Sequence, residues 1–121
     1  MTGALNLGAH QFAITEDAQL VGSIGLRVGK HRTGYVGYWC ARDARGRGIT
    51  TRALRRVCRY GLEDLGLERL ELTTDVENVA SQRIAEKVGF QREGVLRSHL
   101  AHPDGHRRDS VLFSLLPGEL R

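Results

Sequence analysis

Residues 45–50, with the sequence Arg-Gly-Arg-Gly-Ile-Thr, are the stretch whose residue types and spacing point most directly to chemistry. Glycines at positions 46 and 48 let the backbone approach a ligand closely, and successive N–H groups can then point at one anion. A helical apolar pattern follows at once, and a helix N-terminus favours phosphate at the same place. The stretch is not a Walker loop, because no Gly-Lys-Ser/Thr follows, and it lacks the third glycine of a dinucleotide fingerprint. It therefore predicts a phosphate or pyrophosphate site of another kind.

Hydrophobic periodicity predicts the elements that position this loop. Period-two alternation is typical of strands, and apolar residues at three- and four-residue steps are typical of helices. In chain order the pattern predicts strands over 11–16, 19–28 and 33–41, a helix over 49–65, a strand over 67–74, a helix over 78–88, and strands over 90–102 and 107–116. The order β-β-β-α-β-α-β-β indicates an α/β fold in a single domain spanning residues 1–121.

A second informative stretch, residues 78–94, begins Asn-Val-Ala-Ser and continues to Glu-Lys-Val-Gly-Phe and Glu-Gly. It resembles the Asn-x-x-Ser…Glu-Lys-x-Gly-Phe…Glu-Gly signature of the Rim-type branch of the GNAT N-acetyltransferases. Residues 45–50 resemble the acyl-CoA pyrophosphate loop of the same family, Arg/Gln-x-x-Gly-x-Gly/Ala, with Thr50 in place of the small last residue. Two motifs in this order and at this separation are more specific than either alone.

This resemblance implies a GNAT-like mixed, mainly antiparallel sheet and transfer of an acetyl group from acetyl-CoA to a primary amine by direct attack. The strand over residues 35–41 would splay from its parallel neighbour over 70–74 and leave room for pantetheine. Backbone groups near Cys40 and Ala41 would pair with the pantetheine amides, and one N–H there would stabilise the oxyanion. The implied pyrophosphate-binding residues are Arg45, Gly46, Arg47, Gly48, Ile49 and Thr50.

Asn78 and Ser81 lie one helical turn apart on the same face of the second predicted helix. The resemblance implies that Asn78 contacts the cofactor as well as capping the helix, and that the Ser81 hydroxyl protonates the leaving thiolate. A packing role for Ser81 is the alternative. No general base is assigned: Leu100 falls where Rim-type enzymes can carry a carboxylate. Nearby His99 and His102 have suitable pKa values, but we favour ordinary surface roles for both.

Composition indicates a soluble globular domain, with 40% hydrophobic and 26% charged residues among 121. Residues 1–8 resemble neither a signal peptide nor a membrane span, so we expect a cytoplasmic protein with no membrane partner. The two cysteines, Cys40 and Cys58, lack metal-site or disulfide spacing, and no metal is expected. Cys40 is not expected to act as a covalent nucleophile, because direct transfer needs none.

The formal net charge of +4 comes mainly from arginine, and a row of arginines follows the outer faces of the first predicted helix. Such a surface attracts polyanions. It lacks the interleaved aromatic residues of a nucleic-acid stacking surface, so a solvated helix face is favoured and nucleic acid is not an expected partner.

The GNAT family usually begins with a further strand and two helices that form one wall of the acceptor cleft, and we expect this chain to lack them. An uncovered sheet edge at residues 12–14 and an uncovered face would favour a homodimer or another tight complex. A non-catalytic CoA-binding or protein-interaction module is therefore the alternative to an enzyme. The acceptor, a protein N-terminus or a small-molecule amine, is left open.

Overall fold

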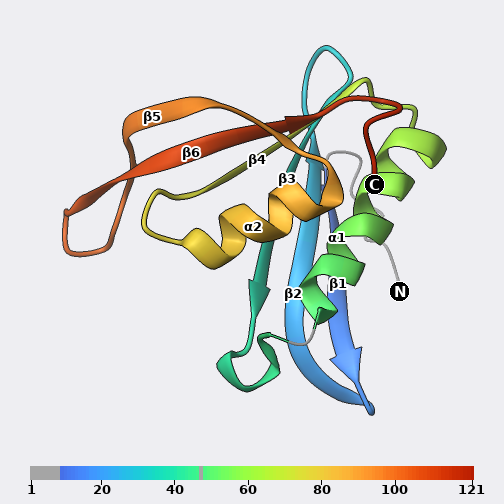
Figure 1. Ribbon diagram of the computed structural model, residues 1–121, viewed down its shortest axis with the longest axis horizontal. Coiled ribbons are helices and arrows are strands. Elements are labelled where there is room, and N and C mark those ends of the chain that lie inside the picture. The colour runs from blue at the N-terminus through green and yellow to red at the C-terminus, as the bar shows by residue number, and fades with distance from the viewer. Residues whose placement is uncertain (1–8, 47) are drawn as a thin grey trace.

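The computed structural model describes residues 9–46 and 48–121 as one six-stranded sheet with helices on one face (Figure 1). The main elements are β1 (Ala9–Glu16), β2 (Gln19–Val28), β3 (Thr33–Cys40), α1 (Ile49–Arg59), β4 (Arg69–Asp75), α2 (Val79–Val88), β5 (Gln91–Ala101) and β6 (Arg107–Leu115). A 3-10 turn, η1 (Arg42–Ala44), precedes α1, and a π-helical turn, η2 (Tyr60–Asp64), extends it. The predicted β-β-β-α-β-α-β-β order is confirmed.

The strands lie in the order β1-β2-β3-β4-β6-β5. Every neighbouring pair is antiparallel except β3 and β4, which are parallel because α1 carries the chain back across the sheet between them. The mixed, mainly antiparallel sheet that the resemblance implied is therefore confirmed. The single parallel junction lies in the middle of the sheet, directly beside the glycine-containing loop.

The hydrophobic core lies between one face of the sheet and the two helices, which pack against each other. Alternate strand residues such as Ile24, Leu72 and Phe113 point into it, and Leu54 and Val57 of α1 are fully buried against them. Burying such side chains stabilises the fold by about 1.5–3 kcal/mol each. This packing fixes α1, and with it the loop at its N-terminus, against β2 and β3.

The first helical segment has the predicted extent but changes type in its last turn. Regular α-helix ends at Arg59 rather than continuing to residue 65, and η2 replaces the last turn, with Leu65 N–H donating to the Tyr60 carbonyl at 3.0 Å. Gly61 faces Leu26 and the sheet within this wider turn, so the backbone there lies close to the core. Gly66, at φ 67°, then reverses the chain into β4.

The second helix has the predicted boundaries and caps. The Asn78 side chain accepts a hydrogen bond from Ser81 N–H at 3.1 Å, and Gly89 ends the helix in the left-handed region at φ 114°. The C-terminal segment then crosses this end of the helix, where Arg121 N–H donates to the Val88 carbonyl. The Ser81 side chain is therefore held in a defined place in the first turn of α2.

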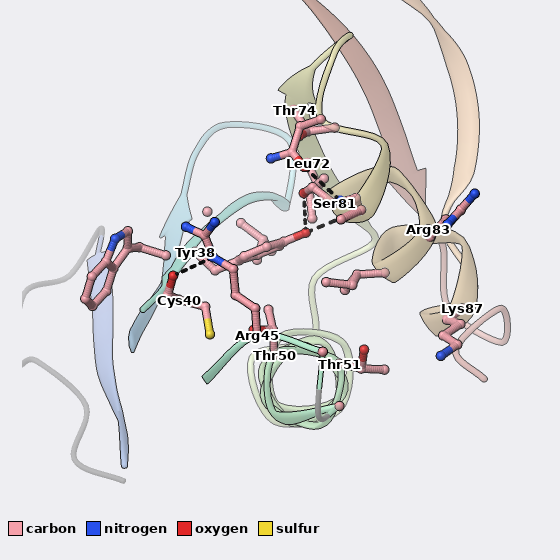
Figure 2. Close-up of a pocket in the computed structure, with 18 of the residues that line it drawn as sticks. Tyr38, Cys40, Arg45, Thr50, Thr51, Leu72, Thr74, Ser81, Arg83 and Lys87 are labelled. Carbon is pink, nitrogen blue, oxygen red and sulfur yellow. Dashed lines mark hydrogen bonds between the residues drawn. The ribbon is translucent and has the colours of Figure 1, made fainter. Parts of the chain in front are cut away.

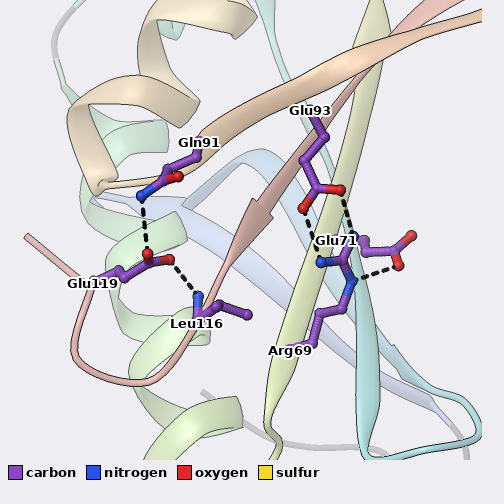
Figure 3. Close-up of polar contacts among 6 residues, drawn as sticks. All are labelled: Arg69, Glu71, Gln91, Glu93, Leu116 and Glu119. Atoms are coloured by element: carbon purple, nitrogen blue, oxygen red, sulfur yellow. Dashed lines mark hydrogen bonds and ion pairs between the residues drawn. The ribbon is translucent and has the colours of Figure 1, made fainter.

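Polar contacts tie the C-terminal strands to the rest of the sheet (Figure 3). The Arg69 guanidinium forms two bonds with the Glu93 carboxylate, at 2.8 and 3.1 Å, and one with Glu71 at 2.9 Å. The Arg69 bonds hold the pKa of the Glu93 carboxyl below its usual value. Because these side chains are partly exposed, the pairs fix the position of β5 more than they add free energy.

The opposite face of the sheet carries no helix among the described residues. Trp39 is 53% exposed on this face, and Tyr35 stacks beneath the Arg27 guanidinium at 4.6 Å. The strand β1 lies at the sheet edge, as predicted, although Phe12 and Ile14 are buried on the helical side. The open face and the open edge are the features on which the expectation of a partner was based.

Candidate functional site

The sheet opens between β3 and β4. These strands pair from Thr33/Arg69 to Val36/Leu72 and then part, although β3 continues to Cys40 and β4 to Asp75. The last residues of both strands therefore have backbone groups that no ladder partner across the gap satisfies, and such groups must find other partners. This is the splay that the resemblance implied between residues 35–41 and 70–74.

A cavity of about 540 Å³ occupies the splay and extends between the N-terminal ends of α1 and α2 (Figure 2). Most of the site residues expected from the sequence meet there. Its walls include Cys40, Arg45, Gly46, Gly48, Thr50, Asn78 and Ser81. Ala41 and Ile49 do not line it, and Arg47 lies outside the described residues. Two sequence motifs about 30 residues apart thus form one site.

Both glycines of the predicted loop adopt backbone conformations that favour glycine. Gly46 and Gly48 both have left-handed backbones, with φ of 82° and 76°, and Gly48 is the N-cap of α1. No side chain of the described residues caps this helix, and the first N–H groups of an α-helix have no acceptor within the helix. The Arg45 side chain folds back, and its Nε donates to the Cys40 carbonyl at 3.1 Å. The loop can present N–H groups and the helix dipole to a phosphate.

The backbone groups that face the splay belong to Tyr38 and Cys40 rather than to Ala41. Ala41 N–H donates to the Val21 carbonyl of the neighbouring chain segment at 2.7 Å, so it is not free for a ligand. In an antiparallel pair successive residues alternate between bonding to the partner and pointing away from it. Tyr38 and Cys40, opposite Ile24 and Gly22, therefore point their N–H and C=O groups at β4.

Tyr38 is a site residue that the sequence analysis missed. Its side chain extends from β3 across the splay, and its Oη lies 2.6 Å from Ser81 Oγ (Figure 2). Burial raises the pKa of the Tyr38 phenol, and the hydrogen bond with Ser81 opposes this only in part, so the phenol is neutral at physiological pH. The signal was present: the alternation of β3 places Tyr38 on the same face as Val36 and Cys40.

Three cationic side chains also line the cavity and were not predicted. Arg83 and Lys87 lie one turn apart on α2 and Arg108 lies on β6. Figure 2 shows Arg83 and Lys87 on the α2 side of the cavity. With the α1 N-terminus opposite, the cavity carries positive charge on two walls, which suits an extended polyanionic ligand.

The three positions considered for a general base differ in what surrounds them. Leu100 is 44% exposed and has no titratable group, and His102 stacks on His106 beside the β5–β6 turn. The His99 Nδ1 atom instead lies 2.9 Å from Ser110 Oγ. The same Ser110 oxygen accepts a hydrogen bond from Arg108 Nε at 3.0 Å. Of the three positions, only His99 shares a hydrogen-bonded neighbour with a residue of the cavity wall.

The remaining chemistry of the described residues is limited. Burial raises the pKa of the Cys58 thiol to about 12, so this cysteine stays protonated in the core. Within residues 9–46 and 48–121 no group of three or more His, Cys, Asp and Glu side chains could hold a metal ion. Within the same part of the chain, no helix is long and apolar enough to cross a bilayer.

This arrangement, a parallel strand pair that opens onto a glycine loop and a helix N-terminus, has the geometry and charge that suit a phosphorylated group carrier. The acetyltransferase (GNAT) domain model matches residues 2–91, and the chain belongs to this family. Among curated proteins, YdaF of Bacillus subtilis (strain 168), named "Putative ribosomal N-acetyltransferase", is 34% identical over 94% of this chain and 63% of its own length. The ribosomal-protein-serine acetyltransferase of Escherichia coli (strain K12) is 30% identical over 75% of this chain and 52% of its own.

Solved structures agree with the family assignment. RimJ of Mycobacterium smegmatis, in complex with CoA-disulfide, is 33% identical with a TM-score of 0.85, over 93% of this chain and 55% of that one. The Microcin C7 self immunity acetyltransferase MccE, in complex with acetyl-CoA and AMP, is 26% identical with a TM-score of 0.80, over 90% and 61%. The chain thus spans roughly three fifths of the length of these relatives.

Proposed function

We propose that the chain is an acetyl-CoA-dependent N-acetyltransferase that moves an acetyl group to a primary amine. The observation that carries this proposal is the continuous cavity from the β3–β4 splay to the glycine loop at the N-terminus of α1. An extended pantetheine arm fits the opening between the strands, and a pyrophosphate fits the N–H groups at the N-terminus of α1. Solved relatives named with CoA-disulfide and acetyl-CoA support the same ligand.

In this proposal the chain acts by holding the reactants and stabilising charge. Backbone groups of Tyr38 and the N–H of Cys40 pair with the pantetheine amides, since the Cys40 carbonyl already accepts from Arg45. An N–H there donates to the thioester carbonyl as it becomes an oxyanion. The neutral amine attacks the carbonyl carbon directly, and binding both reactants makes the attack effectively unimolecular. Collapse of the tetrahedral intermediate breaks the C–S bond, and Ser81 protonates the departing thiolate.

The acceptor class follows from the relatives only as a proposal. YdaF is named for ribosomal N-acetylation, and the E. coli relative is named for a serine of a ribosomal protein. A peptide with a free N-terminal serine is therefore the first acceptor to test, with spermidine and an aminoglycoside as small-molecule amines. Steady release of CoA thiol that requires the amine supports an enzyme. Binding of acetyl-CoA without amine-dependent release would support the non-catalytic module instead.

Replacing Ser81 with alanine tests its proposed role. The Ser81 hydroxyl lies on the cavity wall, and its backbone N–H, not its hydroxyl, makes the capping bond to Asn78. Ser81→Ala should therefore leave the helix intact, leave acetyl-CoA affinity within twofold, and lower turnover by about tenfold to a hundredfold. Calorimetry measures the affinity and thiol release measures the turnover. Unchanged turnover would return Ser81 to a packing role.

We also propose that the chain forms a homodimer. Residues 1–121 would form a single domain, and the protein would be cytoplasmic. The open sheet face with Trp39 and Tyr35 and the open edge at β1 support self-association. Light scattering at low micromolar concentration should give twice the chain mass, while a Trp39→Glu variant should shift toward the monomer mass. A wild-type chain that stays monomeric and unfolds cooperatively would contradict the proposal.

A further inference from the structure

The Tyr38 and Ser81 hydroxyls form a hydrogen-bonded pair inside the proposed pantetheine channel. Their oxygens are 2.6 Å apart, at the short end of the range for O–H···O bonds. The two side chains come from opposite walls, β3 and α2, 43 residues apart in the chain. Both line the cavity, and Ser81 is only 8% exposed. The strand and helix therefore place two hydroxyl groups next to each other on the cavity wall, beside the Ser81 hydroxyl that the proposed function assigns to the CoA sulfur.

The two hydroxyls differ in how easily each can give up a proton. In water a tyrosine phenol ionises near pH 10 and a thiol near 8.5, so a phenol lies far closer to a thiol in acidity than a serine hydroxyl does. A serine hydroxyl does not ionise in the accessible pH range. If Ser81 gave its proton to the thiolate and received none in return, the alkoxide left on its oxygen would be high in free energy. Burial raises the pKa of the Tyr38 phenol, so the phenol carries its proton at physiological pH. Tyr38 is thus the better proton source, and Ser81 is held in front of it.

We propose that Tyr38 is a positioning residue that orients the Ser81 hydroxyl and replaces its proton as the CoA thiolate leaves. The inference rests on the proposed function. When the C–S bond breaks, its electron pair stays on sulfur, which takes the proton of Ser81 Oγ. Ser81 Oγ takes the proton of Tyr38 Oη, and the resulting phenolate is reprotonated from water. The proton that the amine nitrogen loses goes to water, so the overall transfer consumes no proton.

The test uses the titration of the thiol of bound CoA, which needs no acceptor amine. Thiolate absorbance is followed against pH, with the complex of the same protein and desulfo-CoA as the blank. A hydroxyl that donates to the sulfur stabilises the thiolate, so removing that donor should raise the thiol pKa. We expect Tyr38→Phe and Ser81→Ala each to raise it by about one pH unit, the shift expected when a hydrogen bond to a charged group is lost.

The chain offers matched controls, because its three tyrosines occupy different sites. Tyr35 lies on the open face, and Tyr60 bonds to His10 away from the cavity. The Tyr35→Phe/Tyr60→Phe double variant should therefore titrate as the wild type does. In that background 3-fluorotyrosine is incorporated at position 38 alone, and it keeps the ring and the hydroxyl. The fluorinated phenol is a stronger hydrogen-bond donor, so the pKa of the bound CoA thiol should fall.

The outcomes separate this inference from the proposed function. If calorimetry detects no CoA binding to the wild type, the proposed function fails, and this inference fails with it. If CoA binds but the thiol pKa is the same in wild type, Tyr38→Phe and the fluorinated protein, Tyr38 has no such role while the proposed function stands. A Tyr38→Phe/Ser81→Ala variant should shift no further than Ser81→Ala, whereas additive shifts would show that Tyr38 does not act through Ser81.

Discussion

Replacing Gly48 with valine should weaken acetyl-CoA binding by tenfold or more. Gly48 has φ 76° and ψ 5° at the N-cap of α1, a conformation that a β-branched residue adopts only with strain of about 1–3 kcal/mol. A side chain there would also meet the Arg52 guanidinium, 3.3 Å from the position of the added Cβ. To relieve this strain, the backbone at position 48 must rotate. The N–H groups that would hold the pyrophosphate then turn away from their original direction.

The control for this variant is Gly105→Val in the turn between β5 and β6. Gly105 has a similar φ of 88°, and an added Cβ would contact no atom within 4 Å. It does not line the cavity, so this variant carries the same kind of backbone strain away from the site. Calorimetry below both unfolding temperatures should show wild-type affinity for Gly105→Val. Equal affinities in the two variants would contradict a phosphate site at this loop.

Local sequence signals predicted the elements because each depends on nearby residues. Residues alternate in β2 and β3 because only one face of each strand meets the core. The spacing in α1 has the same cause, and its core-facing residues Leu54, Val57 and Cys58 are fully buried. The end of this helical segment was predicted within a residue, but its π-helical last turn was not, because η2 depends on packing of Gly61 against β2 and β4. That contact joins residues far apart in the chain, and no local pattern encodes it.

The same distinction separates the site residues that were found from those that were missed. The glycine loop and the Asn78–Ser81 turn are contiguous motifs, and the structure places both on one cavity. Tyr38 belongs to the site only because β3 parts from β4, which depends on the pairing of two strands on either side of α1. The choice between Cys40 and Ala41 depends likewise on the register between β2 and β3. Each of these properties is set by the sheet and not by a motif.

Replacing Gly22 with alanine should destabilise the fold and impair the site together. An added Cβ at Gly22 would lie 2.3 Å from the Trp39 carbonyl oxygen and 3.2 Å from the Cys40 Cα, both backbone atoms of β3. Backbone in the middle of a sheet cannot move aside as a flexible side chain can, so β2 and β3 must separate locally. We expect a loss of about 1–3 kcal/mol in the free energy of unfolding, measured by denaturant titration.

The matched variant for this prediction is Gly37→Ala on the neighbouring strand. Gly37 also lies within the sheet, pairs with Gly25, and would meet no atom within 4 Å on gaining a Cβ. Its free energy of unfolding should stay within about 0.5 kcal/mol of the wild type.

Gly22 lies opposite Cys40, where β3 leaves the sheet for the glycine loop. Gly22→Ala should therefore also weaken CoA binding, measured under conditions where the variant is folded. Equal stability of the two variants would show that β2 and β3 accommodate the extra methyl group, and normal CoA affinity in a destabilised Gly22→Ala would show that this strand pair does not set the geometry of the site.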